Sequence, residues 1–210
     1  FKKHIKQGDL YTGIGQAGKA LNSGIIVMGT HGLKGLQYLF GSHANKIVMN
    51  SEIPILITQD RLPKNDNIDH IVMPIDLVSE EKQILSIVSK VAQTFAAKVH
   101  LFVAEKTDEF QKNAVHRNVS FAKRYLNEHG ITFSTTHANA EEDFDKQIIN
   151  YADLTNADVI AILNHHEDGI KNIFGTNFDQ NIISNWAKIP VLMINAKTNS
   201  SVQDVFGVFS

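Results

Sequence analysis

The feature that most constrains this chain is an internal repeat, in which one block of sequence recurs 134 residues further on. In both copies an apolar run, at 25–28 and again at 159–163, precedes a loop that ends in Phe-Gly followed by Ser or Thr. Without gaps, residues 9–42 laid on 143–176 give eight identities, at Asp9, Ile14, Asn22, Ile26, His31, Gly35, Phe40 and Gly41. Similarity at a fixed spacing is typical of duplicated structural units. We therefore expect two related units.

Composition excludes several classes of protein. The chain has 210 residues, of which 43% are hydrophobic and 20% charged, enough to bury one core or two. A formal net charge of -2 provides no basic field for nucleic acid or an anionic membrane, so neither is expected as a partner. The absence of cysteine excludes a disulfide framework and a thiolate metal site, and it suits a reducing compartment. We expect a cytoplasmic protein.

Residues 68–196 have the pattern of a complete α/β unit. Apolar residues at helical spacing, among them Ile84, Val88 and Phe95, lie between two short runs rich in β-branched residues. The last predicted helix carries Phe178 and Trp186. The predicted strands are 70–76, 99–104, 131–136, 159–163 and 191–194. Continuously apolar strands that alternate with helices favour a doubly wound parallel sheet of five strands.

Residues 1–59 match only the later half of such a unit. We predict a strand near 1–7, a helix over 11–21, a strand over 25–28, a helix after Ser42 and a strand over 55–58. The repeat spacing places the counterpart of Asp76 at position −58, so we expect a native polypeptide about 60 residues longer. The polar stretch 60–67 is the predicted linker. The tail 197–210 ends in apolar residues, and we expect it either to pack on a neighbouring surface or to remain loose.

An ordered set of motifs resembles the universal stress protein family in its tandem two-domain form. The motifs are VMGTHG at 27–32, GS at 41–42, IPILI at 53–57, IVMPID at 71–76 and IPVLMI at 189–194. The resemblance implies the adenine nucleotide alpha hydrolase-like fold, with five strands in the order 3-2-1-4-5. Ligands in such sheets bind at the carboxyl ends of the strands, where the strand order reverses.

The resemblance also implies ATP, with magnesium, or another adenine nucleotide as ligand of the first unit. Nucleotide-binding members carry G-x2-G-x9-G followed by Ser or Thr, because glycines let the backbone approach the phosphates. After Met28, the residues Gly29, Gly32, Gly41 and Ser42 stand in that order, but eight residues rather than nine separate Gly32 from Gly41. We therefore keep a second reading, in which these glycines shape a loop inherited from a nucleotide-binding ancestor.

The second unit departs from the motif in another way. It keeps Asp76, which the resemblance assigns to the adenosine part of the ligand, and also Gly175 and Thr176. Leu163 and His166 replace the two leading glycines, and their side chains would crowd a triphosphate. We expect the first unit to be the better nucleotide site.

Two further patterns are weak signals. Residues 13–18 fit the dinucleotide motif G-x-G-x-x-G, but no acidic residue lies about 20 positions on, so we predict a glycine-rich helix. His165 and His166, with His137, suggest zinc or copper, but neighbouring residues on an extended chain point in opposite directions. We therefore nominate no metal ligand.

Catalysis has little support in the sequence. There is no G-x-S-x-G elbow and no P-loop ending in Gly-Lys-Ser or Gly-Lys-Thr, so we nominate no catalytic residue and expect slow ATP hydrolysis at most. The competing class is an interaction scaffold, since exposed strands at the edge of a sheet favour pairing. We expect self-association or an intramolecular pseudo-dimer, with 55–58 against 191–194, and an unidentified protein partner.

Overall fold

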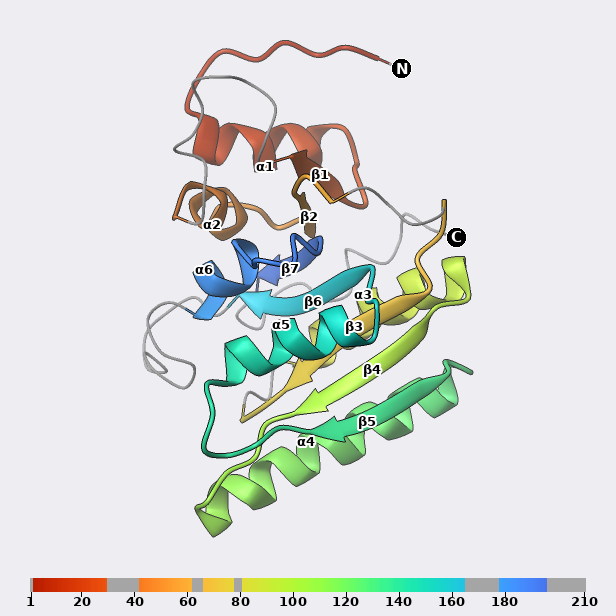
Figure 1. The fold of residues 1–210 in the computed structure, drawn as a ribbon. Coiled ribbons are helices and arrows are strands. Elements are labelled where there is room, and N and C mark those ends of the chain that lie inside the picture. Colours follow the sequence, from red (N-terminus) through yellow and green to blue (C-terminus); the bar gives the residue numbers. More distant parts are fainter. Residues whose placement is uncertain (1, 30–41, 62–65, 78–80, 165–177, 196–210) are drawn as a thin grey trace.

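One mixed sheet of seven strands runs through the molecule (Figure 1). The computed structural model describes residues 2–29, 42–61, 66–77, 81–164 and 178–195. The strand order across the sheet is β1-β2-β7-β6-β3-β4-β5. The strands are β1 (Ile26–Gly29), β2 (Ile55–Thr58), β3 (His70–Ile75), β4 (Lys98–Val103), β5 (Phe133–His137), β6 (Val159–Asn164) and β7 (Val191–Asn195). The helices are α1 (Leu10–Ala20), α2 (Ser42–Met49), α3 (Glu81–Phe95), α4 (Glu109–Glu128), α5 (Phe144–Leu154) and α6 (Phe178–Ile183).

The five strands that follow residue 66 are parallel to their neighbours within this group. Their order is β5-β4-β3-β6-β7, which in chain order is third, second, first, fourth and fifth. The strand order therefore reverses between β3 and β6. This point is where an open α/β sheet leaves room for a ligand at the carboxyl ends of its strands.

An antiparallel pair joins the two repeats into this single sheet. Ile55 of β2 pairs with Met193 of β7, and Leu56 pairs with Leu192. The pairing expected between 55–58 and 191–194 is therefore present within the chain. The expectation of a separate five-stranded sheet needs correction, because β2 occupies the edge of β7 that would otherwise leave its backbone groups without partners.

The repeated sequences form corresponding elements. Moved by 134 positions, the bounds of α1 become 144–154, which are the bounds of α5. The identical residues Asp9 and Asp143 are the N-caps of these two helices. Asn22 and Asn156, another identical pair, follow the helices with φ of 54° and 55°. Asparagine tolerates this left-handed backbone better than most residues, which explains why the turn keeps it.

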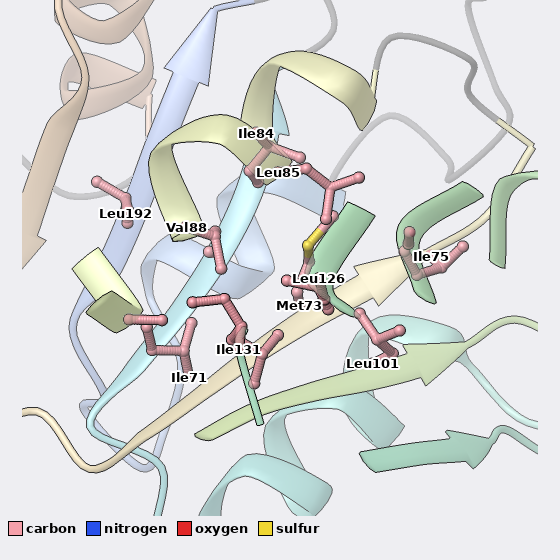
Figure 2. Packing of buried hydrophobic residues seen from close by; sticks show 14 of the residues in the cluster. Ile71, Met73, Ile75, Ile84, Leu85, Val88, Leu101, Leu126, Ile131 and Leu192 are labelled. Atoms are coloured by element: carbon pink, nitrogen blue, oxygen red, sulfur yellow. The ribbon is translucent and has the colours of Figure 1, made fainter. Parts of the chain in front are cut away.

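Two hydrophobic clusters cover the two faces of the sheet. Side chains of β3 alternate between the faces: Ile71 and Met73 belong to the cluster beneath α3 and α4, and Val72 to the cluster beneath α2, α5 and α6. In Figure 2, Ile71, Met73 and Ile75 follow one another along β3, in the same cluster as Leu85 and Val88 of α3. Because both faces are covered, most residues of the central strands are apolar.

Three sequence-based expectations differ from the structure. Residues 2–8 form no strand, and Ile5 is 90% exposed, since no described strand lies beside this segment to pair with it (Figure 1). The last helix ends at Ile183 and leaves out Trp186, because buried Asn185 binds Ile182 O and Ile189 O, each at 2.9 Å, and turns the chain toward β7. The strand expected at 131–136 forms at Phe133–His137, two residues later than predicted at its start.

Parts of the predicted organisation cannot be compared with the structure. Residues 62–65 of the linker and the tail 197–210 lie outside the described residues. No helix within the described ranges combines the length and the apolar character that a membrane span requires.

Candidate functional site

Asp76 lies at the point where the strand order reverses, directly after β3. Its side chain is only 1% exposed. Lys106, which follows β4, places its Nζ 2.9 Å from Oδ1 and 2.9 Å from Oδ2 of Asp76. Because β3 and β4 are parallel neighbours, their carboxyl ends bring these two opposite charges together. The predicted ligand residue therefore already has a charged protein partner.

The main chain around Asp76 is also held in place. The amide of Leu77 donates to Asp76 Oδ1 at 2.8 Å, and Asn118 Nδ2 of α4 donates to the Asp76 carbonyl at 2.7 Å. Burial raises the pKa of Asp76 above its usual value, and hydrogen bonding to the Lys106 ammonium and its charge oppose that rise. The site is thus built around a buried ion pair in which both partners have fixed positions.

Two asparagines occupy the carboxyl ends of the neighbouring strands. Asn164 ends β6, is 3% exposed, and donates from Nδ2 to Oδ1 of Asn195, at the end of β7, at 2.7 Å. Leu163, which stands where the nucleotide motif has its first glycine, is 6% exposed and belongs to the hydrophobic core. These side chains, and not open backbone, line this end of the sheet.

Asn195 also connects the two repeats. Its Nδ2 lies 2.6 Å from Val48 O, 3.0 Å from Met49 O and 3.0 Å from Ser51 O, at the end of α2. Carbonyls in the last turn of a helix have no partner within the helix, and here a side-chain amide supplies one. Sequence reasoning did not find Asn164 or Asn195, although both follow apolar runs at strand ends.

The structure describes only part of the glycine motif of the first repeat. Strand β1 ends at Gly29, after half-buried Met28, and the backbone of Ser42 begins α2. Gly32, Gly41, Gly175 and Thr176 lie outside the described residues. Three strands separate β1 from β3, so the structure does not bring Asp76 together with Gly29.

The universal stress protein family model matches residues 1–59. A universal stress protein from Archaeoglobus fulgidus superposes with a TM-score of 0.67 and 17% identity, over 95% of this chain and 70% of its own. A putative universal stress protein from Pseudomonas aeruginosa gives a TM-score of 0.60 and 16% identity, over 90% and 69%. No curated protein matches the sequence.

The two comparisons support different statements. The family match covers the repeat that carries Gly29 and Ser42. The structural likeness extends across both repeats, and at these identities it establishes a universal stress protein fold for the chain. A shared fold does not by itself show a shared ligand, so the site residues have to carry the functional argument.

The dinucleotide-like glycines of the first repeat have a packing role. They lie inside α1, which confirms the predicted glycine-rich helix. A Cβ on Gly15 would lie 2.7 Å from Asn50 O, and a Cβ on Gly18 would lie 2.9 Å from the side chains of Ile26 and Ile53. A Cβ on Gly13 would have no such neighbour within 4 Å. Two of the three glycines therefore let α1 approach its neighbours closely.

Buried His100 and three partly buried polar groups form a chain on the face of the sheet opposite α3. His100 Nε2 is 3.1 Å from His70 Nδ1, and His100 Nδ1 is 3.2 Å from both Tyr151 Oη and Ser134 Oγ. Burial, followed by the nearby charges of His70 and Lys98, lowers the pKa of His100 to about 4. The sequence analysis missed this group, because its members lie on three strands and one helix.

The described histidines do not form a metal centre. His137 Nδ1 is 2.6 Å from Glu105 Oε1 at the ends of β5 and β4. In the described ranges, no group of three His, Cys, Asp or Glu side chains is arranged to hold a metal ion. His165 and His166 lie outside those ranges.

Proposed function

We propose that this chain is a non-catalytic cytoplasmic stress-response module with two unlike units. The first unit, residues 1–59, takes an adenine nucleotide, and the second, residues 68–196, is its structural partner across a linker at 60–67. The reducing compartment is consistent with a chain that has no cysteine. The tandem organisation is supported by the matching bounds of α1 and α5.

Nucleotide binding is supported by the positions at which β1 ends and α2 begins in the first unit. Strand β1 ends on Gly29 and α2 begins at Ser42, so residues 30–41 connect the end of a strand to the N-terminus of a helix. Free amides at a helix start attract phosphate, and a glycine at the strand end leaves the backbone accessible. These features fit the phosphate part of ATP, whose charge would be shared with its bound magnesium.

Calorimetric titration tests this proposal directly. ATP with magnesium and, separately, AMP would be titrated into the longest native polypeptide that contains this chain. A Gly29→Leu variant copies Leu163, the residue at the matching place in the second unit, and a Gly13→Ala variant controls for replacing a glycine of the same unit. We expect binding by the wild type and by Gly13→Ala, and its loss in Gly29→Leu.

A nucleotide-independent scaffold is the second candidate. It is favoured by the pairing of β2 with β7 and by the bonds from Asn195 to α2, which together join the two repeats. A wild type that binds no nucleotide at millimolar concentration would support this scaffold. The search would then turn to the protein partner.

A further inference from the structure

The oxygens of the Asp76 carboxylate are already used by the protein. Oδ1 accepts from the Leu77 amide at 2.8 Å and lies 2.9 Å from Lys106 Nζ, and Oδ2 accepts from the same Nζ at 2.9 Å. A nucleoside hydroxyl that bound Asp76 would have to donate to one of these oxygens. With the side chain only 1% exposed, the carboxylate is almost completely covered by protein.

Lys106 is also well placed to remain there. Its side chain is 19% exposed, so its stem is largely covered while its ammonium points at Asp76. Asn118 holds the Asp76 carbonyl from α4, which fixes the end of β3 at the same place. Withdrawal of Lys106 would leave a carboxylate buried without its counter-charge, which is a strongly unfavourable state.

The neighbouring phosphate position is filled as well. Leu163 contributes its side chain to the core, and Asn164 is bound to Asn195. A triphosphate would meet the Leu163 side chain where the motif of the first unit has Gly29. Two observations on different strands thus point the same way.

We infer that Lys106 closes the second unit to nucleosides by occupying Asp76, so that Asp76 anchors the structure and Lys106 determines that this unit is ligand-free. This inference goes beyond the proposed function, which concerns the loop after β1. It makes the two units unequal through a residue that the glycine motif does not include.

The test is residue-resolved NMR of the isotope-labelled full chain. The Leu77 amide reports on Asp76, because it donates to that carboxylate. ATP, AMP and adenosine would be added separately to the wild type and to the variants Lys106→Ala and Lys106→Arg. Lys112→Ala is the control, because Lys112 lies on α4 with its side chain 45% exposed. Thermal melts would establish that each variant is folded.

We expect the Leu77 amide signal to stay unmoved by all three ligands in the wild type, Lys106→Arg and Lys112→Ala. In Lys106→Ala, adenosine should move that signal with saturation in the millimolar range. A ligand-dependent shift in the wild type would overturn the inference, as would a folded Lys106→Ala that does not respond. If Lys106→Ala does not fold, Lys106→Met, which keeps most of the stem, replaces it. The result is independent of binding at Gly29, which the Leu77 signal does not report.

Discussion

Asn164 and Asn195 lie at the carboxyl ends of two adjacent parallel strands and are joined by a hydrogen bond of 2.7 Å. Asn195 in turn binds carbonyls at the end of α2, whose first residue is Ser42, the last residue of the glycine motif. A side chain of the second repeat thus completes a helix of the first. The two repeats are therefore joined by side-chain hydrogen bonds as well as by the pairing of β2 with β7.

Replacing Asn195 by Ala should lower the free energy of unfolding by about 1–3 kcal/mol, because the carbonyls at the end of α2 lose their donor. Urea denaturation measures this change. The matched control is Asn181→Ala, since Asn181 is exposed and bonds to Asp145 at the surface. The control should change stability by less than about 0.5 kcal/mol. Equal effects of the two substitutions would show that the Asn195 contacts add nothing.

The three glycines of α1 should respond differently to alanine. Gly15→Ala should cost about 1–3 kcal/mol of stability, because its Cβ would collide with the Asn50 carbonyl, which is backbone and cannot easily move. Gly18→Ala should cost less, since it meets the ends of two isoleucine side chains. Gly13→Ala should stabilise the protein by up to about 1 kcal/mol through helix propensity. Thermal denaturation gives the order, and a stabilising Gly15→Ala would contradict the packing argument.

The free energy of unfolding should fall as the pH drops from 6.5 to about 4, because the pKa of His100 is lowered in the folded protein. In the unfolded chain this histidine has its ordinary pKa of 6.5, and in the folded protein a pKa of about 4. Below pH 6.5 the unfolded state therefore binds more protons, and the contribution of His100 is lost progressively down to about pH 4. From pH 7 to pH 5 the loss should be about 1–2 kcal/mol.

A His100→Gln variant isolates this effect from other titrating groups, among them Asp76, whose raised pKa acts in the opposite direction. Urea denaturation of both proteins at pH 7 and pH 5 gives the comparison. The variant should lose less stability than the wild type between these two values. The same dependence in both proteins would rule out His100 as its source.

Breaking the Asp76–Lys106 pair on one side should be costly, and breaking it on both sides less so. Lys106→Met leaves the buried carboxylate without its partner and should lower stability by about 3 kcal/mol. Adding Asp76→Asn removes that uncompensated charge and should recover part of the loss. A double-mutant cycle in urea measures the coupling. Purely additive effects would mean that the two groups do not interact in solution.

The sequence was sufficient to predict much of the fold because both repeats carry strong periodic patterns. The structure contains the helix predicted over 11–21 and the strands predicted near 25–28 and 55–58, with bounds that differ by a residue or two at most. It also contains the predicted pairing of 55–58 with 191–194. Trp186 was misplaced because its apolar character suits a helix, whereas the bonds of Asn185 end that helix earlier. The strand predicted near residue 1 failed because a strand needs a neighbour, which local sequence does not reveal.

The site was harder to predict. Asp76 was nominated through the family resemblance, as the last residue of a predicted strand. Lys106, 30 residues on, is charged like many surface residues and gives no local signal. The same holds for Asn195, whose partners at 48–51 are distant in the sequence. Both sets of contacts depend on which elements lie side by side in the fold, and local sequence does not specify that arrangement.

The central claim is that one unit of this chain takes nucleotide and the other does not. Calorimetric titration of ATP with magnesium into the longest native polypeptide, with its Gly29→Leu and Asp76→Asn variants, tests it most directly. We predict a stoichiometry of one ATP per chain for the wild type and for Asp76→Asn, and no binding for Gly29→Leu. Two ATP per chain, or a loss of binding in Asp76→Asn with Gly29→Leu unaffected, would contradict it.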